Sequence, residues 1–198
     1  MKGQKGEKRR RELLEIAYRL FIQKGYENTS IEDILAQANI AKGTYYYYFP
    51  SKQATLEAGI DWMISQEVKQ ARLVLQSSLP VPQKLVAVIA ALRPQQEEES
   101  IADSLNSSEN IVMHQKIKKR IVKEATPLLA KVVEEGIEQG IFSCENIEER
   151  VKMILILSQH LFDEGDYSAG DVEVFIEMVE KSLGASEGSL GFVRNLIQ

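Results

Sequence analysis

The side chains best suited to chemistry in this chain gather between residues 42 and 52. Four consecutive tyrosines, residues 45 to 48, stand between Lys42 and Lys52. On a helix successive side chains turn by about 100°, so four tyrosines in a row cannot all face a core. Both lysines fall where helices are expected to begin, and there a cation opposes the helix dipole by about 0.3–1 kcal/mol. A polyanion would offset that cost, so the run predicts a surface that binds DNA.

Two short helices are expected to position this run. Thr29 and Glu32 have the spacing of a capping box, and the apolar residues that follow predict a helix over about 30–37. Only a tight turn separates it from a second helix, about 41–47, which must therefore cross the first steeply. Tyr45 and Phe49, four apart, would form the inner face of the second helix. The outer face, which we predict reads DNA, comprises Lys42, Gly43, Thr44, Tyr46 and Tyr47.

The rest of the chain also reads as helical. A helix of about 8–24 should pack across the short pair, and Pro50 ends that pair before a long helix of about 51–76. Further helices are expected over about 83–92, 111–139 with a kink or restart at Thr126-Pro127, 146–163 and 171–183. The predicted fold is all-α, with an N-terminal three-helix helix-turn-helix domain over residues 1–52 and a larger C-terminal helical domain over 53–198.

These residues, in this order, resemble one known family. The segments are FIQKGYENTSI at residues 21–31, ILA at 34–36 and KGTYYYYFPSK at 42–52. Over about residues 8–60 the chain is similar to the N-terminal domain of TetR-type transcriptional regulators. The resemblance implies a homodimer whose second short helices enter the major groove of a double-stranded, palindromic DNA operator. It also implies phosphate contacts for Thr29, Tyr48 and Lys52. Two departures are Ala41, where the family often has a capping serine, and Tyr45, where Leu or Ile is usual.

The resemblance further implies that the C-terminal domain binds an effector and forms the dimer. The expected function is a repressor released from its operator by an unknown small molecule. The residues expected to line an effector pocket are Trp62, Met63, Met113, His114, Met153 and Phe162. The residues expected in the dimer interface, a four-helix bundle between subunits, are Ile154, Leu155, Leu161, Phe162, Phe175, Ile176 and Val179. Each of these apolar residues could instead be ordinary core of one subunit.

Charge is divided unevenly along the chain. The net charge is −5. Residues 1–52 carry ten Lys/Arg and six Asp/Glu, whereas residues 53–198 carry fourteen Lys/Arg and twenty-three Asp/Glu. The basic end is therefore the expected DNA end. Its first residues are expected to form a flexible basic arm that follows phosphates or enters a minor groove, with a solvated tail as an equal alternative. The basic residues of this arm are Lys2, Lys5, Lys8, Arg9, Arg10 and Arg11.

Composition narrows the remaining classes. No apolar run approaches the roughly 20 residues that span a bilayer, and no signal peptide is evident, so a cytoplasmic protein without membrane contact is expected. Cys144 is the only cysteine, and neither a cofactor nor a metal site is predicted. Two other classes stay open at this stage. One is a helical adaptor that binds protein through its tyrosines, and the other is an all-α small-molecule enzyme, for which no catalytic constellation is found.

Overall fold

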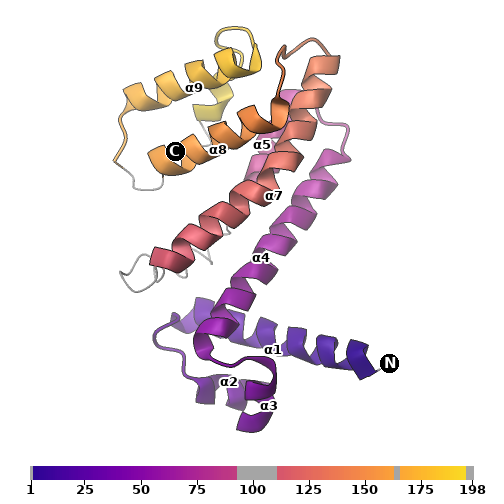
Figure 1. The fold of residues 1–198 in the computed structure, drawn as a ribbon, viewed down its shortest axis with the longest axis vertical. Helices are drawn as coiled ribbons and strands as arrows, with labels where there is room; N and C mark the ends of the chain where they lie inside the picture. Colours follow the sequence, from indigo (N-terminus) through magenta and orange to yellow (C-terminus); the bar gives the residue numbers. More distant parts are fainter. Residues whose placement is uncertain (1, 93–110, 163–165, 195–198) are drawn as a thin grey trace. The chain divides into compact units, whose positions relative to one another are not determined.

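The computed structural model describes residues 2–92, 111–162 and 166–194, with side chains from residue 5 in the first range and from residue 115 in the second. All regular elements in these ranges are helical (Figure 1). They are α1 (Lys2–Lys24), α2 (Ile31–Ala38), α3 (Lys42–Tyr48), α4 (Lys52–Leu75), α5 (Val81–Ala91), α7 (Ile111–Glu138), α8 (Ile147–Phe162), α9 (Ala169–Leu183) and the short 3₁₀ helix η3 (Gly191–Val193). The all-α prediction is confirmed.

The described residues form two compact units. The first contains residues 2–66 and the start of α7 up to Ile117, and the second contains residues 67–92 and those from Lys118 onward. The division between the units thus falls within α4, whose first half belongs with α1, α2 and α3. The functional boundary predicted between residues 52 and 53 stays a prediction. Among the described helices, none is both long enough and apolar enough to cross a membrane.

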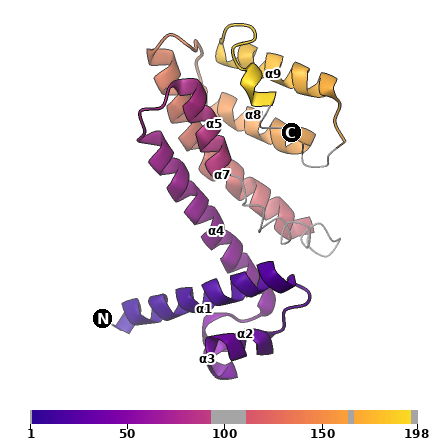
Figure 2. The ribbon, with the colours of Figure 1, turned by 180° about the vertical axis from the view of Figure 1, so that it is seen from behind.

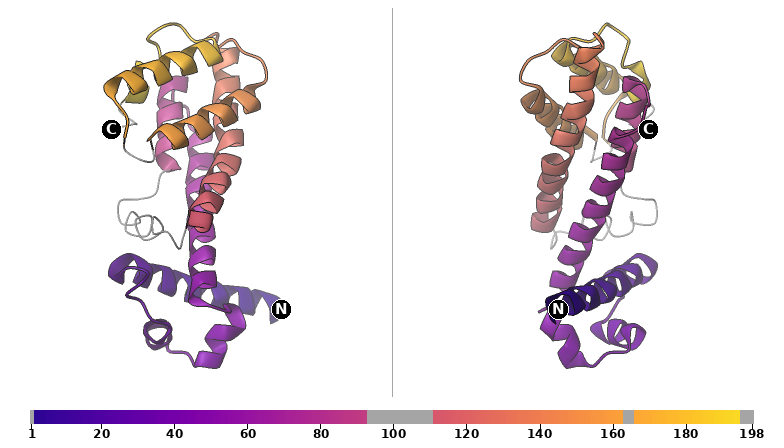
Figure 3. Two further views of the ribbon diagram at one scale, coloured as in Figure 1. Left: turned by 60° about the vertical axis from the view of Figure 1, so that its left-hand side comes forward. Right: turned by 90° about the vertical axis from the view of Figure 1, so that its right-hand side faces the viewer.

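In the first unit α2 and α3 lie together against one side of α1 (Figure 3). The buried faces of α1 and α4 supply most of the apolar interior of this unit. Its core residues include Leu13, Leu14, Ala17, Tyr18, Phe21, Ile34, Tyr45, Phe49, Leu56 and Ile60. Gly59 allows α4 to approach α1 closely, because a Cβ at this position would lie 2.7 Å from Cδ2 of Tyr18. The ring of Tyr18 also meets Trp62 edge-on, with the ring centroids 5.9 Å apart.

The basic start of the chain is helical, which corrects the expectation of a flexible arm. Helix α1 begins at Lys2 and runs without interruption to Lys24. Two ion pairs at helical spacing support its first half, Arg9–Glu12 at 3.0 Å and Arg11–Glu15 at 3.3 Å. The helix ends before Gly25, whose φ of 82° lies in the left-handed region that favours glycine.

The capping box of α2 lies one residue later than the sequence suggested. Ser30 is the N-cap, and its hydroxyl accepts a hydrogen bond from the Asp33 backbone N–H at 3.0 Å. Asp33 accepts in return from the Ser30 backbone N–H at 2.9 Å. The Thr29–Glu32 prediction was wrong because either pair fits the spacing, and the Thr29 side chain is needed in the core.

In the second unit α8 and α9 lie side by side (Figure 2). Helix α7 is continuous through Pro127, so the restart that the sequence allowed is absent. Gly136 gives the Phe142 ring room against α7, because a Cβ there would come within 2.3 Å of that ring. Lys84 of α5, buried among apolar neighbours, donates to Glu135 of α7 at 2.6 Å. This buried charge is paired, as the interior of a protein requires.

Candidate nucleic-acid interface

Helix α3 has one buried side and one open side. Tyr45 and Phe49 are 0% and 1% exposed, whereas Tyr46 and Tyr47 are 44% and 81% exposed. The other residues of the predicted outer face are exposed as well, namely Lys42, Gly43 and Thr44. The division between inner and outer residues is therefore the one that the helical spacing predicts. Tyr47 is thus a large aromatic side chain that lies mostly in water.

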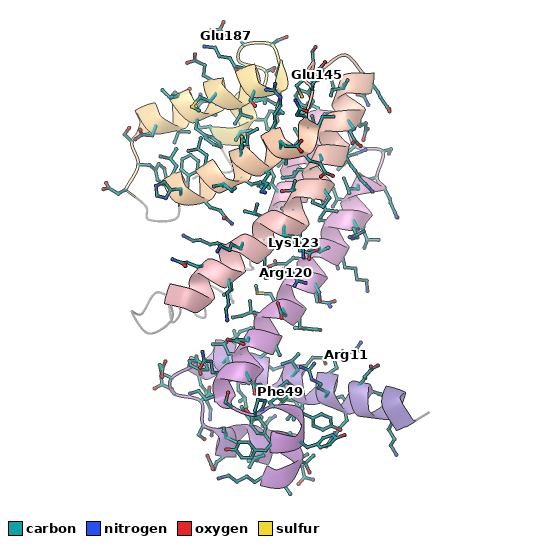
Figure 4. The ribbon with its side chains drawn as sticks, in the orientation of Figure 1. Arg11, Phe49, Arg120, Lys123, Glu145 and Glu187 are labelled. Atoms are coloured by element: carbon teal, nitrogen blue, oxygen red, sulfur yellow. The ribbon has the colours of Figure 1, made fainter. Side chains whose placement is uncertain are left out.

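Tyr45 fastens α3 to α4. Its phenolic oxygen lies 2.6 Å from the hydroxyl oxygen of Thr55, and both side chains are buried. Phe49 packs beside Tyr45 with the ring centroids 6.1 Å apart, and its backbone N–H donates to the Tyr45 carbonyl at 2.9 Å. Burial raises the pKa of Tyr45, and the hydrogen bond with Thr55 partly opposes this rise. Figure 4 shows Phe49 between the end of α3 and the start of α4.

The first turn of α3 is open toward solvent. Ala41 is its N-cap and provides no side-chain hydrogen bond to the helix. Lys42 lies at the first helical position, and its ammonium group is 3.4 Å from a carboxylate oxygen of Glu32 on α2. At Gly43 a Cβ would meet no atom of the protein within 4 Å. This turn therefore offers a cation, the N–H groups of a helix start and an unobstructed approach, which together suit a phosphate or a base edge.

The turn between α2 and α3 is compact. Asn39 adopts the left-handed conformation with φ 49°, and its backbone N–H donates to the Ala36 carbonyl at 3.3 Å. The Ile40 N–H donates to the Leu35 carbonyl at 3.1 Å. These bonds close the end of α2 and redirect the chain within three residues, since asparagine tolerates this backbone region better than most residues. A turn this short is the one expected between the two helices of a helix-turn-helix motif, and the steep crossing of the two stays a prediction.

Thr29 is a supporting residue, which corrects its prediction as a phosphate contact. Its side chain is 0% exposed. The hydroxyl lies within hydrogen-bond distance of the carbonyl oxygens of Gly25, at 2.8 Å, and Leu20, at 3.2 Å. Its single proton goes to one of these carbonyl groups or is shared between them. A buried hydroxyl cannot reach DNA, and Thr29 instead holds the α1–α2 connection in place.

Lys52, the first residue of α4, contacts the same connection from outside it. Its ammonium group donates to the Tyr26 carbonyl oxygen at 2.7 Å and lies 4.2 Å from the centre of the Tyr26 ring. The first residue of α4 is thus tied to the loop before α2. Tyr48, half-buried, meets Tyr47 edge-on with the ring centroids 5.0 Å apart. Neither geometry tests a phosphate contact, and both contacts stay predictions.

A charged cluster fixes the start of α2. Lys24 donates to Asp33 at 2.9 Å, next to the capping box. The hydrogen bond from Lys24, followed by those from the backbone and hydroxyl of Ser30, lowers the pKa of Asp33 well below its usual range. Asp33 is therefore ionised at neutral pH, where a carboxylate suits the positive end of the helix dipole.

Two contacts at this interface were not foreseen from the sequence. Arg10 of α1 lies over the Phe49 ring, with Cζ 4.9 Å from the ring centre. Thr55 supplies the buried hydrogen-bond partner of Tyr45. Nothing in the local spacing could place Arg10 beside Phe49, because the contact joins segments far apart in the chain.

The predicted effector residues are divided between the two units, so a pocket that they share stays a prediction. Trp62 and Met63 pack against Tyr18, whose hydroxyl donates to the Met63 sulfur at 2.8 Å. Phe162 is half-buried and stacks edge-on against Phe175 and Tyr167. The prediction for Met153 is wrong for a pocket within one subunit, because this side chain lies on the open side of α8 and is 69% exposed. The side chains of Met113 and His114 lie outside the described residues.

The predicted dimer residues also need correction. Phe175, Ile176 and Val179 are buried within their own unit, at 5%, 5% and 9% exposure, so they are not free to meet a partner. Ile154, Leu155, Leu161 and Phe162 are partly buried. The opposite faces of α8 and α9 expose other apolar side chains, which we call the α8/α9 stripe. It comprises Met153, Ile156, Leu157, Val174 and Met178.

Both the N-terminal and the C-terminal part of the chain match known protein families. Residues 13–58 match the bacterial regulatory proteins of the tetR family, and residues 94–176 match the tetracyclin repressor-like C-terminal domain. The uncharacterized HTH-type transcriptional regulator YuxN of Bacillus subtilis is 50% identical over 44 residues, which is 22% of this chain and 15% of that protein. The biofilm operon icaADBC negative transcriptional regulator IcaR of Staphylococcus aureus is 38% identical over 48 residues, 24% of this chain and 26% of that protein.

Among solved structures, the fold is similar to that of RolR in complex with resorcinol. The TM-score is 0.60 at 21% sequence identity, and the match covers 99% of this chain and 96% of that chain. At this identity the likeness shows the fold alone. The similarity to the two curated regulators spans 15% and 26% of their own length, so it concerns one segment of each and not the whole protein.

Proposed function

Because this chain belongs to the TetR family of bacterial regulatory proteins, we propose that it is a transcriptional regulator that binds double-stranded DNA through α3. The matched families consist of regulators and not of enzymes. One observation carries the proposal. Helix α3 is anchored by the buried Tyr45 and Phe49 and turns an exposed surface of lysine, glycine, threonine and tyrosine outward.

The composition of that surface suits the major groove. The groove is about 12 Å wide and admits a helix, and a threonine can contact base edges by its hydroxyl or its methyl group. Tyr46 and Tyr47 add hydroxyl groups that can reach phosphates or bases, and Gly43 lets the DNA backbone approach closely. We assign base reading to Thr44 and Tyr46 and phosphate contacts to Lys42, Tyr48 and Lys52.

The working form is a homodimer on a palindromic operator. The α8/α9 stripe supports this step, because five large apolar side chains on two adjacent helices stay in water in a single chain. Covering them with the same stripe of a second subunit gives an isologous four-helix arrangement. Two reading helices related by a twofold axis would then contact half-sites about 34–36 Å apart.

The regulator acts as a repressor that a small molecule releases. The similarity to the negative regulator IcaR supports repression, and the RolR complex with resorcinol supports a body that binds a small molecule. The effector would bind better to a form of the dimer in which the two α3 helices are not spaced to match the half-sites. Its binding would then shift the population away from the DNA-bound form.

The test is fluorescence anisotropy of the purified protein with duplexes from the DNA immediately upstream of its gene and with a scrambled duplex, across a salt series. Tight, sequence-dependent binding with a steep salt slope is the expected result. A random-sequence selection then identifies the operator, whether or not it lies upstream. Equal, salt-insensitive binding to all duplexes, with no sequence recovered by selection, would favour the protein-binding adaptor instead.

A further inference from the structure

A basic helical extension precedes the segment that matches the family. The match begins at residue 13, whereas α1 begins at Lys2. Residues 2–11 contain six Lys/Arg and one Glu. From Lys5 onward the basic side chains of this extension are all exposed, including Lys8 and Arg10. Arg11, which Figure 4 labels on α1, pairs with Glu15.

Two contacts fix this extension beside the reading helices. Arg9 donates to the Ala38 carbonyl at the end of α2, at 3.5 Å, and Arg10 lies over Phe49, the residue that follows α3. The extension therefore packs against the two short helices, one of which carries the proposed DNA surface. Among the described side chains of the extension, Arg9 pairs with Glu12, Arg11 pairs with Glu15 and Arg10 lies over the Phe49 ring. This leaves Lys5 and Lys8 as the described cations of the extension with neither an ion pair nor a ring contact.

The positive charges of the extension destabilise it as a helix when no partner is bound. Its first turn holds no acidic residue, so the positive charge of Lys5 opposes the helix dipole without compensation there. Lys5 also stands three and four residues before Lys8 and Arg9, spacings at which like charges repel. Gly6 weakens the same turn, by roughly 0.5–1 kcal/mol relative to alanine. A polyanion bound along this face would neutralise these charges and so remove both the repulsion between them and their opposition to the helix dipole. The charges of the extension therefore favour a polyanionic partner.

We propose that residues 2–12 dock as a helix on the DNA phosphate backbone outside the half-site, with Lys5 and Lys8 as the contacts. This inference rests on the proposed DNA-binding function. A helix is about 10–12 Å wide and cannot enter a minor groove of about 6 Å, which an extended arm could do. The major groove is assigned to α3. The extension, about 16 Å long at 1.5 Å per residue, therefore lengthens the footprint without reading sequence.

The first test compares two double variants of the full-length protein on the duplex that the wild type selects from a random pool. The test variant is Lys5→Gln with Lys8→Gln. The matched control is Lys119→Gln with Lys123→Gln, which removes two exposed lysines of α7. The salt slope of the test variant should fall by about 0.9 for each phosphate that is no longer neutralised, equally on selected and scrambled DNA. The control should keep the wild-type slope.

The second test separates a docked helix from an extended arm. Gly6→Ala raises helix propensity, and a Cβ at residue 6 meets no atom within 4 Å. Gly6→Pro breaks the helix. A docked helix predicts binding by Gly6→Ala at least as tight as the wild type, and a loss of outer backbone protection in hydroxyl-radical footprints with Gly6→Pro.

The outcomes separate the two proposals. If the wild type selects no duplex, the proposed function fails and this inference fails with it. If the wild type binds and the Lys5/Lys8 variant keeps its slope, only this inference is wrong. If that slope falls but Gly6→Pro binds like the wild type, or the loss depends on A·T pairs in the flanks, an extended arm in the minor groove replaces the docked helix.

Discussion

The phenolic oxygen of Tyr45 and the hydroxyl oxygen of Thr55 lie 2.6 Å apart inside the first unit and join the reading helix to α4. Thr55 also donates to the Ser51 carbonyl at 3.0 Å. Because a threonine hydroxyl has one proton, Tyr45 must be the donor in the shared bond. The usual Leu or Ile of the family could not make this bond, so the tyrosine adds a polar anchor to an otherwise apolar contact.

Tyr45→Phe tests that anchor. The variant loses one buried hydrogen bond and keeps the ring, and Thr55 keeps its bond to Ser51. We expect the free energy of unfolding to fall by about 1 kcal/mol, measured by urea denaturation. DNA affinity should change little, because the outer face is untouched. The matched control is Tyr47→Phe, which removes an exposed hydroxyl. Equal stability of the two variants would show that the Tyr45–Thr55 bond adds nothing.

Alkaline pH provides a second test, through the buried Tyr45 and the half-buried Tyr26. Burial raises the pKa values of Tyr26 and Tyr45 above the ordinary value near 10. A group with a raised folded pKa stabilises the fold fully below its unfolded pKa, and that contribution is lost as pH rises through the folded value. Stability should therefore decline above about pH 10. Tyr45→Phe should show a shallower decline in the same titration, and an unchanged slope would contradict the assignment.

Gly59→Ala should disturb the packing of α1 on α4. The added methyl group would lie 2.7 Å from Cδ2 of Tyr18, whose ring is fixed by Trp62 and Met63. Overpacking of this kind typically costs about 1–3 kcal/mol. Gly43→Ala is the control for stability, because nothing lies within 4 Å of its Cβ position. Thermal unfolding of both variants decides whether a close approach or only helix propensity matters at Gly59.

Lys52→Ala should weaken binding to all DNA sequences and lower the salt slope by about one phosphate. The structure adds a second effect, because Lys52 also holds the Tyr26 carbonyl. Tyr26→Phe is a useful comparison, since it keeps the ring beneath the ammonium group and the carbonyl that accepts from it. An unchanged salt slope in Lys52→Ala, with lower stability alone, would show that Lys52 is a structural tie and not a phosphate contact.

The sequence predicted those features that depend on local spacing. The helical register of residues 42–49 correctly separated the buried Tyr45 and Phe49 from the exposed Tyr46 and Tyr47. It could not decide between Ser30 and Thr29 as the cap, because that choice depends on carbonyls at the end of α1. The wrong choice of dimer residues on α9 has a similar cause. Apolar residues at helical spacing indicate a buried face, but periodicity alone does not say whether that face is covered by its own subunit or by a partner.

The α8/α9 stripe gives the last prediction. If a second subunit covers it, a charge introduced into the stripe must be buried without a partner, which costs several kcal/mol. Met153→Glu with Met178→Glu should therefore give a monomer in analytical ultracentrifugation, and DNA affinity should fall because each half-site is bound alone. The control is Leu73→Glu, which places the same charge at an apolar side chain of α4 that is 55% exposed. The helical content should be unchanged in all variants, because the three positions are open in one subunit. A stable dimer of the double variant would move the interface to another surface.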